Sequence, residues 1–340
     1  MSEENAINDA LRAKLKSSSL FPLWESRFSH STDNGAPDDG RLWQWTSLKE
    51  ILTEVAEIAS PAAIERRVLE MMDPREHYPD GEGAIGTMTA CVQMLKPGEK
   101  ARPHRHSMNA IRFVIESTGG AKTIVDGKDL PMEPGDLVLT PGWCWHAHVH
   151  EGSAPVIWLD VLDLPLHRFL GTEAFQPGPV TGARERTDDE AFAVANVIPV
   201  TAGEGEEYSP VFRYPWKNAA EAVGKAPLRA DGTRQVRYSN PTNGGPALPF
   251  LDFGLIQLDA GARSAAAPVV YDRVCHVVEG AGLAQVGDTA HGLNPKDVFT
   301  VPGGRPLELE AAEGAPLRIF VSSNQPVFEK LGLKSRTLEA

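Results

Sequence analysis

Apolar residues along this chain follow the spacing of short β-strands in two regions, from about residue 84 onward and again from residue 235. Runs of apolar and β-branched residues there alternate with turns rich in glycine, proline and aspartate, for example TMTACVQML, AIRFVIES, DLVLTP and VIWLDVLD. Runs of this length, bounded in this way, are typical of strands. The pattern therefore predicts a protein dominated by β-structure.

The remaining segments have other patterns. Ser47 followed by Glu50 resembles a capping box ahead of the apolar stretch 51–58, which predicts a helix. The segment between the two β-rich regions is charged and rich in proline and glycine, and we expect a connector with a few helical turns. We predict an N-terminal helical arm over 1–80, a first barrel over 81–171, a connector over 172–234 and a second barrel over 235–340.

The two β-rich regions repeat one another at a nearly constant spacing. Aligned pairs in the first half of the repeat are Gly98 with Gly261, His104 with Ala267, His106 with Val269 and Glu116 with Glu279. Aligned pairs in the second half are Pro134 with Pro295, Asp136 with Asp297, Pro141 with Pro302 and His146 with Leu307. A repeat of this kind indicates repeated structural units. The turns persist in the copy but the histidines do not, so we predict a second barrel that serves structure or assembly.

Composition and charge narrow the function. A chain of 340 residues suggests about two domains, and a net charge of −13 argues against nucleic acid or an anionic membrane as partner. No apolar run approaches the ~20 residues of a membrane span, and the polar N-terminus lacks a signal-peptide core. The three cysteines fit a reducing cytoplasm. Cys144 fits a small buried thiol, although its position beside His146 leaves its role open.

Three histidines carry the candidate chemistry. The first two have the spacing Gly98-x5-His104-x-His106, and the third closes Gly135-Asp136-x4-Pro141-x4-His146. Residues i and i+2 of a strand point to one face, so His104 and His106 can present their imidazoles to one point, with His146 supplied by a strand that folds back beside them. Imidazole is a general ligand for divalent iron, zinc, copper and nickel. The pattern predicts a metal site, although paired histidines also occur in solvated strands and turns.

Both histidine segments match the two-part cupin signature. Longer strings, namely HRHSMNAIRFVIE, TPGWCWHAH, VIWLDVLDLPL, RYPW and YSNPTNGGPALP, resemble the bicupin gentisate 1,2-dioxygenases and their salicylate and 1-hydroxy-2-naphthoate relatives. The resemblance extends from FPLW at 21–24 to the end of the second barrel. It implies two double-stranded β-helix (jelly-roll) barrels, one Fe(II) per chain and a homotetramer.

The resemblance also implies a reaction. Such enzymes insert both atoms of O2 into a hydroxylated aromatic acid and cleave the ring between the carboxyl- and hydroxyl-bearing carbons. The expected substrate is gentisate, salicylate or a 5-substituted salicylate such as 5-nitrosalicylate. Ile111 stands five residues after His106, where a carboxylate ligand is usual, so three neutral imidazoles leave the metal more charge for a dianionic substrate.

Arginines are expected to bind the substrate carboxylate, because a guanidinium donates two parallel hydrogen bonds. Arg112 lies in the apolar run 111–115 and matches a substrate-contacting arginine of the family. The alternative is the solvent face of an edge strand. Arg66 and Arg67 resemble a second such arginine, and of the two we favour Arg67 over a surface ion pair.

Other residues are implied around the substrate. His148 shares the strand phase of His146 and matches a family histidine that contacts substrate or dioxygen, the alternative being a position in water at the barrel mouth. Gln93 and Asp160 match positions that orient groups in the pocket, unless they make structural hydrogen bonds. Residues that could wall the cavity, or belong to the plain core, are Trp143, Trp145, Trp158 and Met108.

Thr89 departs from the family, which has a bulky aromatic residue four positions before Gln93. Threonine leaves volume and withdraws one polar contact. We therefore predict a pocket that accepts a larger or less hydrogen-bonding 5-substituent, such as nitro or halogen. Two other classes stay open on the residues alone: a metal-dependent cupin isomerase of a sugar phosphate, and a non-catalytic bicupin that binds a small molecule.

Overall fold

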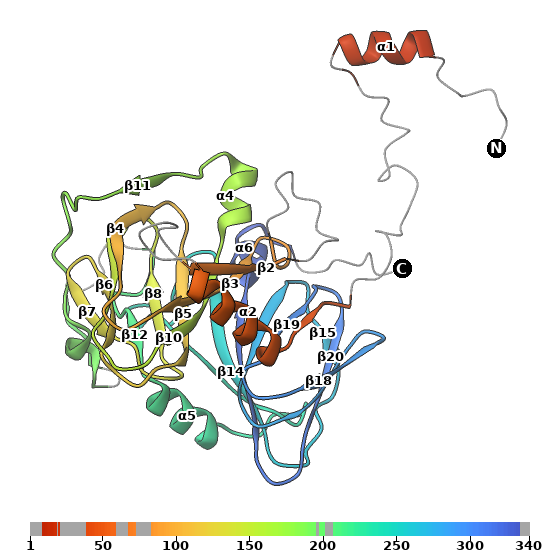
Figure 1. The fold of residues 1–340 in the computed structure, drawn as a ribbon. Coiled ribbons are helices and arrows are strands. Elements are labelled where there is room, and N and C mark those ends of the chain that lie inside the picture. Colours follow the sequence, from red (N-terminus) through yellow and green to blue (C-terminus); the bar gives the residue numbers. More distant parts are fainter. Residues whose placement is uncertain are drawn as a thin grey trace. The chain divides into compact units, whose positions relative to one another are not determined.

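The computed structural model describes residues 9–18, 20, 39–58, 67–72, 83–194, 197–200 and 207–333 (Figure 1). The chain divides into two units, Met1–Asp38 and Asp39–Ala340. In the first unit, helix α1 spans Asp9–Ser17. The second unit contains both barrels.

The first barrel has a six-stranded and a five-stranded sheet, both antiparallel. The six-stranded sheet has the order β12 (Arg213–Tyr214), β8 (Leu137–Thr140), β5 (Ala110–Glu116), β10 (Val156–Leu162), β3 (Thr89–Leu95) and β2 (Arg67–Met71). The five-stranded sheet has the order β11 (Phe175–Pro177), β4 (Lys100–His106), β9 (His146–His150), β6 (Ala121–Val125) and β7 (Lys128–Pro131).

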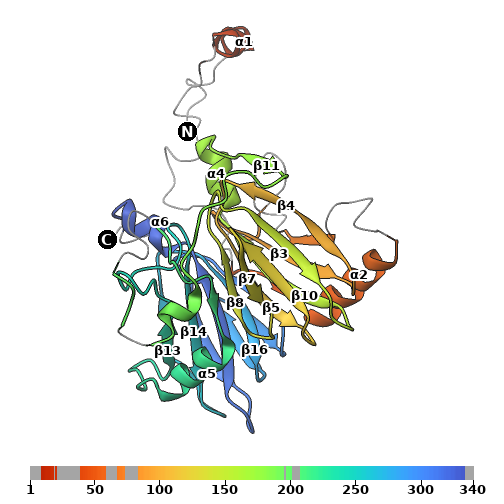
Figure 2. The same cartoon turned by 90° about the vertical axis from the view of Figure 1, so that its left-hand side faces the viewer.

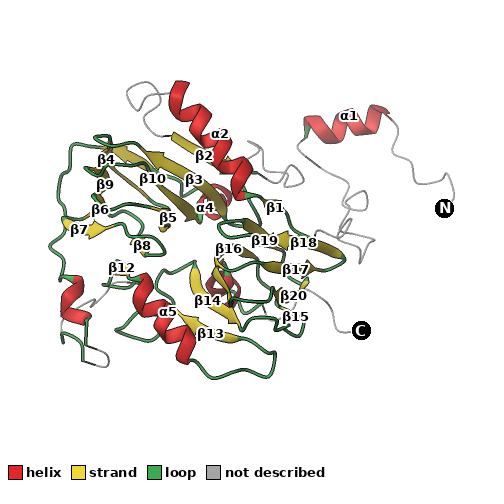
Figure 3. Cartoon of the chain, turned by 60° about the horizontal axis from the view of Figure 1, so that its bottom comes forward, coloured by secondary structure: helices red, strands yellow, loops and turns green. Residues whose placement is uncertain are grey.

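The second barrel repeats this arrangement (Figure 3). Its six-stranded sheet has the order β1 (Leu42–Trp43), β19 (Val298–Val301), β16 (Arg273–Glu279), β21 (Leu317–Ser323), β14 (Asp252–Leu258) and β13 (Arg234–Arg237). Its four-stranded sheet has the order β15 (Ala267–Pro268), β20 (Pro306–Ala311), β17 (Gly282–Val286) and β18 (Thr289–Leu293). The order β8-β5-β10-β3-β2 thus corresponds to β19-β16-β21-β14-β13, which confirms the predicted bicupin fold class.

Helices lie on the outside of the barrels. They are α2 (Trp45–Ile58), α4 (Leu164–Leu170), the 3₁₀ helix η3 (Asp189–Phe192), α5 (Trp216–Lys225) and α6 (Gln325–Lys330). Helix α2 packs against β2 and β3 of the first barrel, and α5 packs against β13 and β14 of the second (Figures 1 and 3). Within the described residues, no helix combines the length and apolar character needed to cross a membrane.

The predicted arm and connector both take part in the barrels, which corrects two predicted boundaries. Strand β1 pairs with β19 of the second barrel, and β2 pairs with β3 of the first, so residues from 39 onward are not a separate arm. Strands β11 and β12 of the predicted connector pair with β4 and β8 of the first barrel. These strands have two to five residues, too few to show a period, and their partners are distant in sequence.

Each barrel also caps a helix that lies on the other barrel. The backbone N–H of Trp45 donates to Asp297 Oδ1 at 2.8 Å, and that of Trp216 donates to Asp136 Oδ1 at 2.8 Å. These aspartates satisfy N–H groups that have no partner within the helix. The predicted capping box is therefore wrong, because Ser47 lies inside α2 and the capping oxygen comes from a residue far away in sequence.

The barrels pack together through the outer faces of their six-stranded sheets, where Figure 2 shows β8 and β5 beside β14 and β16. Phe113 of β5 stacks on Phe320 of β21 with ring centroids 4.2 Å apart, and its edge meets His276 of β16. Successive strand residues point to opposite faces. Since Phe113 faces the neighbouring barrel, Arg112 and Val114 face the interior of the first barrel, where the candidate site lies.

Candidate metal centre

The structure brings His104, His106 and His146 together inside the first barrel. Strands β4 and β9 are antiparallel, with His104 directly opposite His146. One ligand atom from each histidine lies within 4.8 Å of the others, and all three residues are at most 4% exposed. The convergence is the one that the spacing predicted.

Backbone carbonyls orient the three imidazoles. In each case Nδ1 donates a hydrogen bond to a backbone carbonyl oxygen. His104 donates to Arg102 at 2.9 Å, His106 to Met108 at 2.8 Å, and His146 to Cys144 at 3.0 Å. This tautomer leaves Nε2 as the metal-binding atom.

The state of His146 also fits a metal. Its Nε2 is buried and has no hydrogen-bond partner. Burial, reinforced by the neighbouring His106 and Arg112, lowers the pKa of His146 well below its usual value, so the ring stays neutral as a ligand must. Three neutral, buried and oriented imidazoles suit a divalent transition metal.

A cavity of about 320 Å³ opens beside His106. Its other lining residues come from β2, β3, β5, β10 and α4, namely Val68, Glu70, Thr89, Cys91, Gln93, Ala110, Arg112, Asp160, Leu162 and Leu164. The strand registers arrange them in rows across the sheet. Arg112, Asp160, Cys91 and Glu70 form one row over four strands.

Arg112 faces this cavity and not solvent. The residue is buried, its Nε lies 3.5 Å from Asp160 Oδ1, and its Nη1 donates to the hydroxyl of Thr140. Asp160 Oδ2 in turn accepts a hydrogen bond from Trp158 Nε1 at 3.0 Å. The guanidinium is thus held in place on one side of the cavity.

Gln93 and Thr89 also line the cavity, and Thr89 presents only a small side chain there. Gln93 Nε2 is buried and, in the part of the chain that the structure describes, has no hydrogen-bond partner, which leaves an amide donor for a ligand. His148 is buried rather than in water at the barrel mouth: its Nδ1 and the Thr123 hydroxyl are hydrogen-bonded at 3.0 Å. It is not part of the cavity lining but lies next to His146, with 6.3 Å between ring centroids.

The structure places Arg67 away from the cavity, contrary to our prediction. Arg67 is opposite Met94 in the register of β2 and β3, and its Nη1 donates to Glu99 Oε2 at 2.6 Å. Strand alternation puts Val68 and Glu70, not Arg67, on the cavity face. Arg66 lies outside the described residues.

The four predicted wall residues also lie elsewhere. Trp143 is 38% exposed and has Arg105 4.7 Å above its ring, whereas Trp145 is buried and donates from Nε1 to the carbonyl of Thr181. Trp158 belongs to a small apolar cluster deeper in the barrel. Met108 contributes its carbonyl to His106 and does not line the cavity. The cavity lining described above contains no tryptophan.

Sequence reasoning missed Glu70 and Cys91. Glu70 Oε1 is buried and has no hydrogen-bond partner within the described residues. Burial raises the pKa of this carboxyl group, partly opposed by Arg168 and the N–H of Gly83. Cys91 lies between Thr89 and Gln93 on the cavity face of β3. The signal that would have found Glu70 is the pairing of β2 with β3, which the short strand does not reveal by itself.

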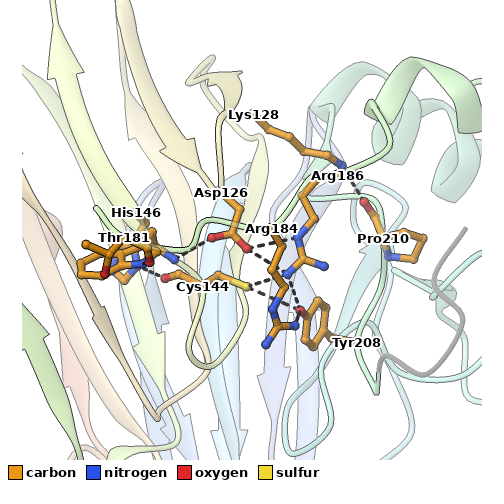
Figure 4. Close-up of polar contacts among 10 residues, drawn as sticks. Asp126, Lys128, Cys144, His146, Thr181, Arg184, Arg186, Tyr208 and Pro210 are labelled. Carbon is orange, nitrogen blue, oxygen red and sulfur yellow. Dashed lines mark hydrogen bonds and ion pairs between the residues drawn. The ribbon is translucent and has the colours of Figure 1, made fainter. Parts of the chain in front are cut away.

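A polar network supports the chain just before His146 (Figure 4). Asp126 Oδ1 accepts from the N–H of Trp145 at 2.9 Å, and its Oδ2 accepts from Arg186 Nη2 at 2.9 Å. Arg186 Nη2 also donates to the hydroxyl of Tyr208 at 2.7 Å. Cys144 lies among these groups, and burial, together with the charge of Asp126, raises the pKa of its thiol to about 12. Cys144 is therefore a buried thiol whose carbonyl orients His146.

Comparisons with known proteins agree with this site. A cupin domain model matches residues 91–162. The chain is 35% identical over 334 residues to gentisate 1,2 dioxygenase 1 of Aquipseudomonas alcaligenes, covering 94% of this chain and 93% of the relative. It is 32% identical over 338 residues to a 5-aminosalicylate 1,2-dioxygenase of Comamonas sp, covering 96% and 88%. The crystal structure of a salicylate 1,2-dioxygenase from Pseudaminobacter salicylatoxidans matches with a TM-score of 0.85 at 29% identity, covering 98% and 97%.

Fold and site together define a bicupin whose first barrel has a three-histidine metal centre. The chain belongs to the gentisate 1,2-dioxygenase family of aromatic ring-cleaving oxidoreductases. This confirms the predicted family and enzyme class. The comparisons give no support to an isomerase or to a non-catalytic bicupin.

Proposed function

We propose that this protein is an Fe(II)-dependent dioxygenase with one iron per chain. It cleaves the ring of a salicylate-type acid between the carboxyl- and hydroxyl-bearing carbons. The observation that carries the proposal is the position of Arg112 in the cavity that opens directly beside His106. Among the described residues, the ligand group contains no carboxylate. When bound, iron supplies a Lewis acid and a template for the acid and O2.

The protein residues bind and orient the acid. Arg112 binds the substrate carboxylate through its guanidinium, which Asp160 and Thr140 hold in a fixed direction. Gln93 donates its amide N–H to an oxygen of the substrate. A fixed guanidinium loses little conformational freedom on binding, so its contact contributes to affinity and to orientation alike.

His148 handles the phenolic proton in this proposal. Its ring lies on the same face of β9 as His146, and Thr123 fixes the ring through Nδ1. Because Nδ1 is engaged, Nε2 is the nitrogen that in this proposal contacts the substrate hydroxyl, where the acid extends from the cavity toward His146. A buried imidazole in this place holds the proton that the hydroxyl loses when the substrate binds as a dianion.

Thr89 and Glu70 together set the preference for the 5-substituent. Thr89 presents a small side chain to the cavity, and in this proposal the volume it leaves beside the ring admits amino, nitro or halogen groups. Glu70 adds polarity, because Oε1 has no partner and accepts hydrogen bonds when ionised. A hydroxyl or amino group donates to it, whereas a nitro group offers only acceptors. We propose that gentisate and 5-aminosalicylate are preferred to 5-nitrosalicylate.

An oxygen-electrode screen after anaerobic Fe(II) reconstitution tests the proposal. We expect O2 uptake with gentisate and 5-aminosalicylate, slower uptake with salicylate and the slowest with 5-nitrosalicylate. Glu70→Gln should raise kcat/KM for the nitro compound relative to the amino compound by about 5- to 30-fold, since one unmatched hydrogen bond costs about 1–2 kcal/mol. Thr89→Trp is the matched control for volume and should slow all 5-substituted acids.

The outcomes separate the parts of the proposal. No uptake with any aryl acid would contradict the dioxygenase function. Uptake with an unchanged order of preference in Glu70→Gln would show only that Glu70 does not contact the 5-substituent.

The assembly and compartment belong to the same proposal. We propose a cytoplasmic homotetramer. The three cysteines are buried thiols that form no disulfide, as expected of a protein in a reducing compartment. Light scattering of the purified protein should give the mass of four chains, and a monomer or dimer would contradict this part.

A further inference from the structure

The second barrel contains a buried cation, Arg273 of β16. It is 9% exposed, and its buried Nε and Nη2 have no hydrogen-bond partner among the described residues. Burial lowers the pKa of this guanidinium, which reflects the loss of water around it. The nearby carboxylate of Asp252 binds Arg237 Nε at 2.8 Å. Asp272, the preceding residue, accepts hydrogen bonds from Asn324 Nδ2 and the N–H of Gly303.

The orphan atoms form one side of the guanidinium. Nε and Nη2 lie on the same edge of the planar group, so their two N–H bonds point in parallel toward one acceptor pair. A carboxylate fits this edge with both oxygens. A buried charge without compensation costs free energy, and that cost favours binding of an anion at this edge.

Arg273 lines a cavity of about 490 Å³ at the position equivalent to the metal cavity of the first barrel. Ala267, Val269 and Leu307, which replace the three histidines, line it as well, together with Leu309 and Ile256. The cavity also contains two ion pairs, Arg229 with Asp231 and Arg237 with Asp252. Among the described arginines of its lining, Arg273 is therefore the one without a carboxylate partner. Its volume is large enough for a small organic acid.

We propose that the second barrel binds an organic monocarboxylate with an apolar body, without a metal. The carboxylate oxygens accept hydrogen bonds from Nε and Nη2 of Arg273. The apolar body packs against Leu307, Val269 and Ala267. This site is separate from the metal centre and does not depend on the function proposed for it.

Calorimetric titration of the iron-loaded protein with benzoate tests the site, because benzoate lacks the hydroxyl needed to chelate a metal. The variants are Arg273→Met, which removes the charge at similar length, and Arg112→Met, the matched change in the first barrel. We expect benzoate binding at least tenfold weaker in Arg273→Met and a retained second-barrel site in Arg112→Met. Acetate should bind more weakly than benzoate, because it has little apolar surface. Turnover of gentisate should change less than twofold in Arg273→Met.

Three further measurements protect the test from a folding defect. Ala267→Trp adds a large ring to the cavity wall and leaves Arg273 in the chain, and it should also abolish benzoate binding. Benzoate should raise the melting temperature of the wild type but not of Arg273→Met. Crystals soaked with 4-bromobenzoate should show bromine in the second barrel. Equal affinity for benzoate in wild type and Arg273→Met, or equal affinity for chloride, acetate and benzoate, would overturn the proposal.

Discussion

The two barrels share a strand order but have opposite interiors. In the first barrel, Arg112 of β5 pairs with Asp160 of β10 and forms a polar inner row. The outer row, at the ends of the same two strands, is apolar and consists of Ala110 opposite Leu162. In the second barrel the inner row is apolar, with Cys275 opposite Val321, and the outer row is polar, with Arg273 opposite Ser323. The arginine thus lies in the inner row of the first barrel and in the outer row of the second. This shift by one row distinguishes the metal pocket of the first barrel from the cavity of the second, which has an apolar interior and a polar mouth.

The framework around the two interiors is retained in more detail. In the first barrel, Asp163 accepts from the N–H and Nδ2 of Asn109, and Asn109 Oδ1 accepts from the N–H of Gly142. In the second, Asn324 and Asp272 make the same set of hydrogen bonds with the two residue types exchanged, and Asp272 Oδ1 accepts from the N–H of Gly303. We call each of these hydrogen-bonded pairs, Asn109 with Asp163 and Asp272 with Asn324, a clasp.

The difference between interior and framework has a physical cause. Each clasp provides hydrogen-bond partners for buried backbone groups at the start of a strand. One amide side chain and one carboxylate side chain must therefore be present in each barrel, in either order. Interior side chains need only fill space, and a barrel can lose a metal site when apolar residues replace the ligands, as at Ala267, Val269 and Leu307. Binding residues are therefore free to diverge where clasp residues are not.

The largest expected effect comes from the histidines that distinguish the barrels. His104→Ala, His106→Ala or His146→Ala should each abolish turnover and reduce bound metal to a small fraction, because two imidazoles hold a divalent ion weakly. Elemental analysis should find one metal per wild-type chain. A content near two would show that the second barrel also binds metal, and normal metal content in any histidine variant would contradict the assigned ligands.

Arg112 is the next largest difference, since its counterpart Cys275 carries no charge. Arg112→Ala should lower kcat/KM for the aryl acid by about 30- to 900-fold, equivalent to ~2–4 kcal/mol for a buried, paired cation. Arg112→Lys should recover only part of the loss, because an ammonium lacks the planar fork. Arg67→Ala is the control: it should lower the melting temperature through its ion pair with Glu99 and leave KM unchanged. A comparable rise of KM in Arg67→Ala would place the substrate carboxylate elsewhere.

Much of this comparison could be predicted from the sequence. The repeat, the loss of the histidines from the second copy and the inward direction of Arg112 all follow from residues within one or two strands, where a period of two fixes the face. Thr89 and Gln93 reached the cavity for the same reason.

Other features depend on pairings between distant segments. Glu70 is in the cavity only because β2 adds to the edge of β3, and Arg67 is excluded by the same register. The tryptophans near His146 were misplaced because Trp143 has a positive φ of 63°, which interrupts strand alternation. The sequence did not predict the role of Arg273, because the lack of a carboxylate partner depends on the hydrogen bonds that Asp252 and Asp272 make with other residues.

The third prediction concerns Asp126, which supports the metal centre from outside. Asp126→Ala leaves the N–H of Trp145 and the guanidinium of Arg186 without this partner, so the segment before His146 should become less ordered. We expect metal affinity to fall about 10- to 100-fold, as for other residues that orient a ligand. Asp126→Asn keeps a hydrogen-bond acceptor, and asparagine tolerates the positive φ of this position. Metal affinity should therefore fall less in Asp126→Asn than in Asp126→Ala. Equal metal affinity in all three proteins, measured by competition with a chelator, would contradict the supporting role.

The smallest effect concerns the clasp of the first barrel and its dependence on pH. Burial raises the pKa of Asp163 to about 6, with Asn109 and His167 acting in the opposite direction. The folded protein therefore keeps this proton between about pH 4 and 6, where the unfolded chain, with a pKa of about 3.9, has lost it. The contribution of Asp163 to stability is thus fully present below about pH 4 and is lost as the pH rises through 6.

Asp163→Asn should remove this pH dependence, seen as a flatter plot of unfolding free energy against pH from 4 to 6. It should also destabilise the protein, because the new amide places a donor against Nδ2 of Asn109. The double variant Asn109→Asp with Asp163→Asn copies the clasp of the second barrel and should return to within about 1 kcal/mol of the wild type at pH 7. If the double variant is as unstable as the single one, the two clasps are not interchangeable, and the amide and carboxylate positions are fixed by each barrel separately.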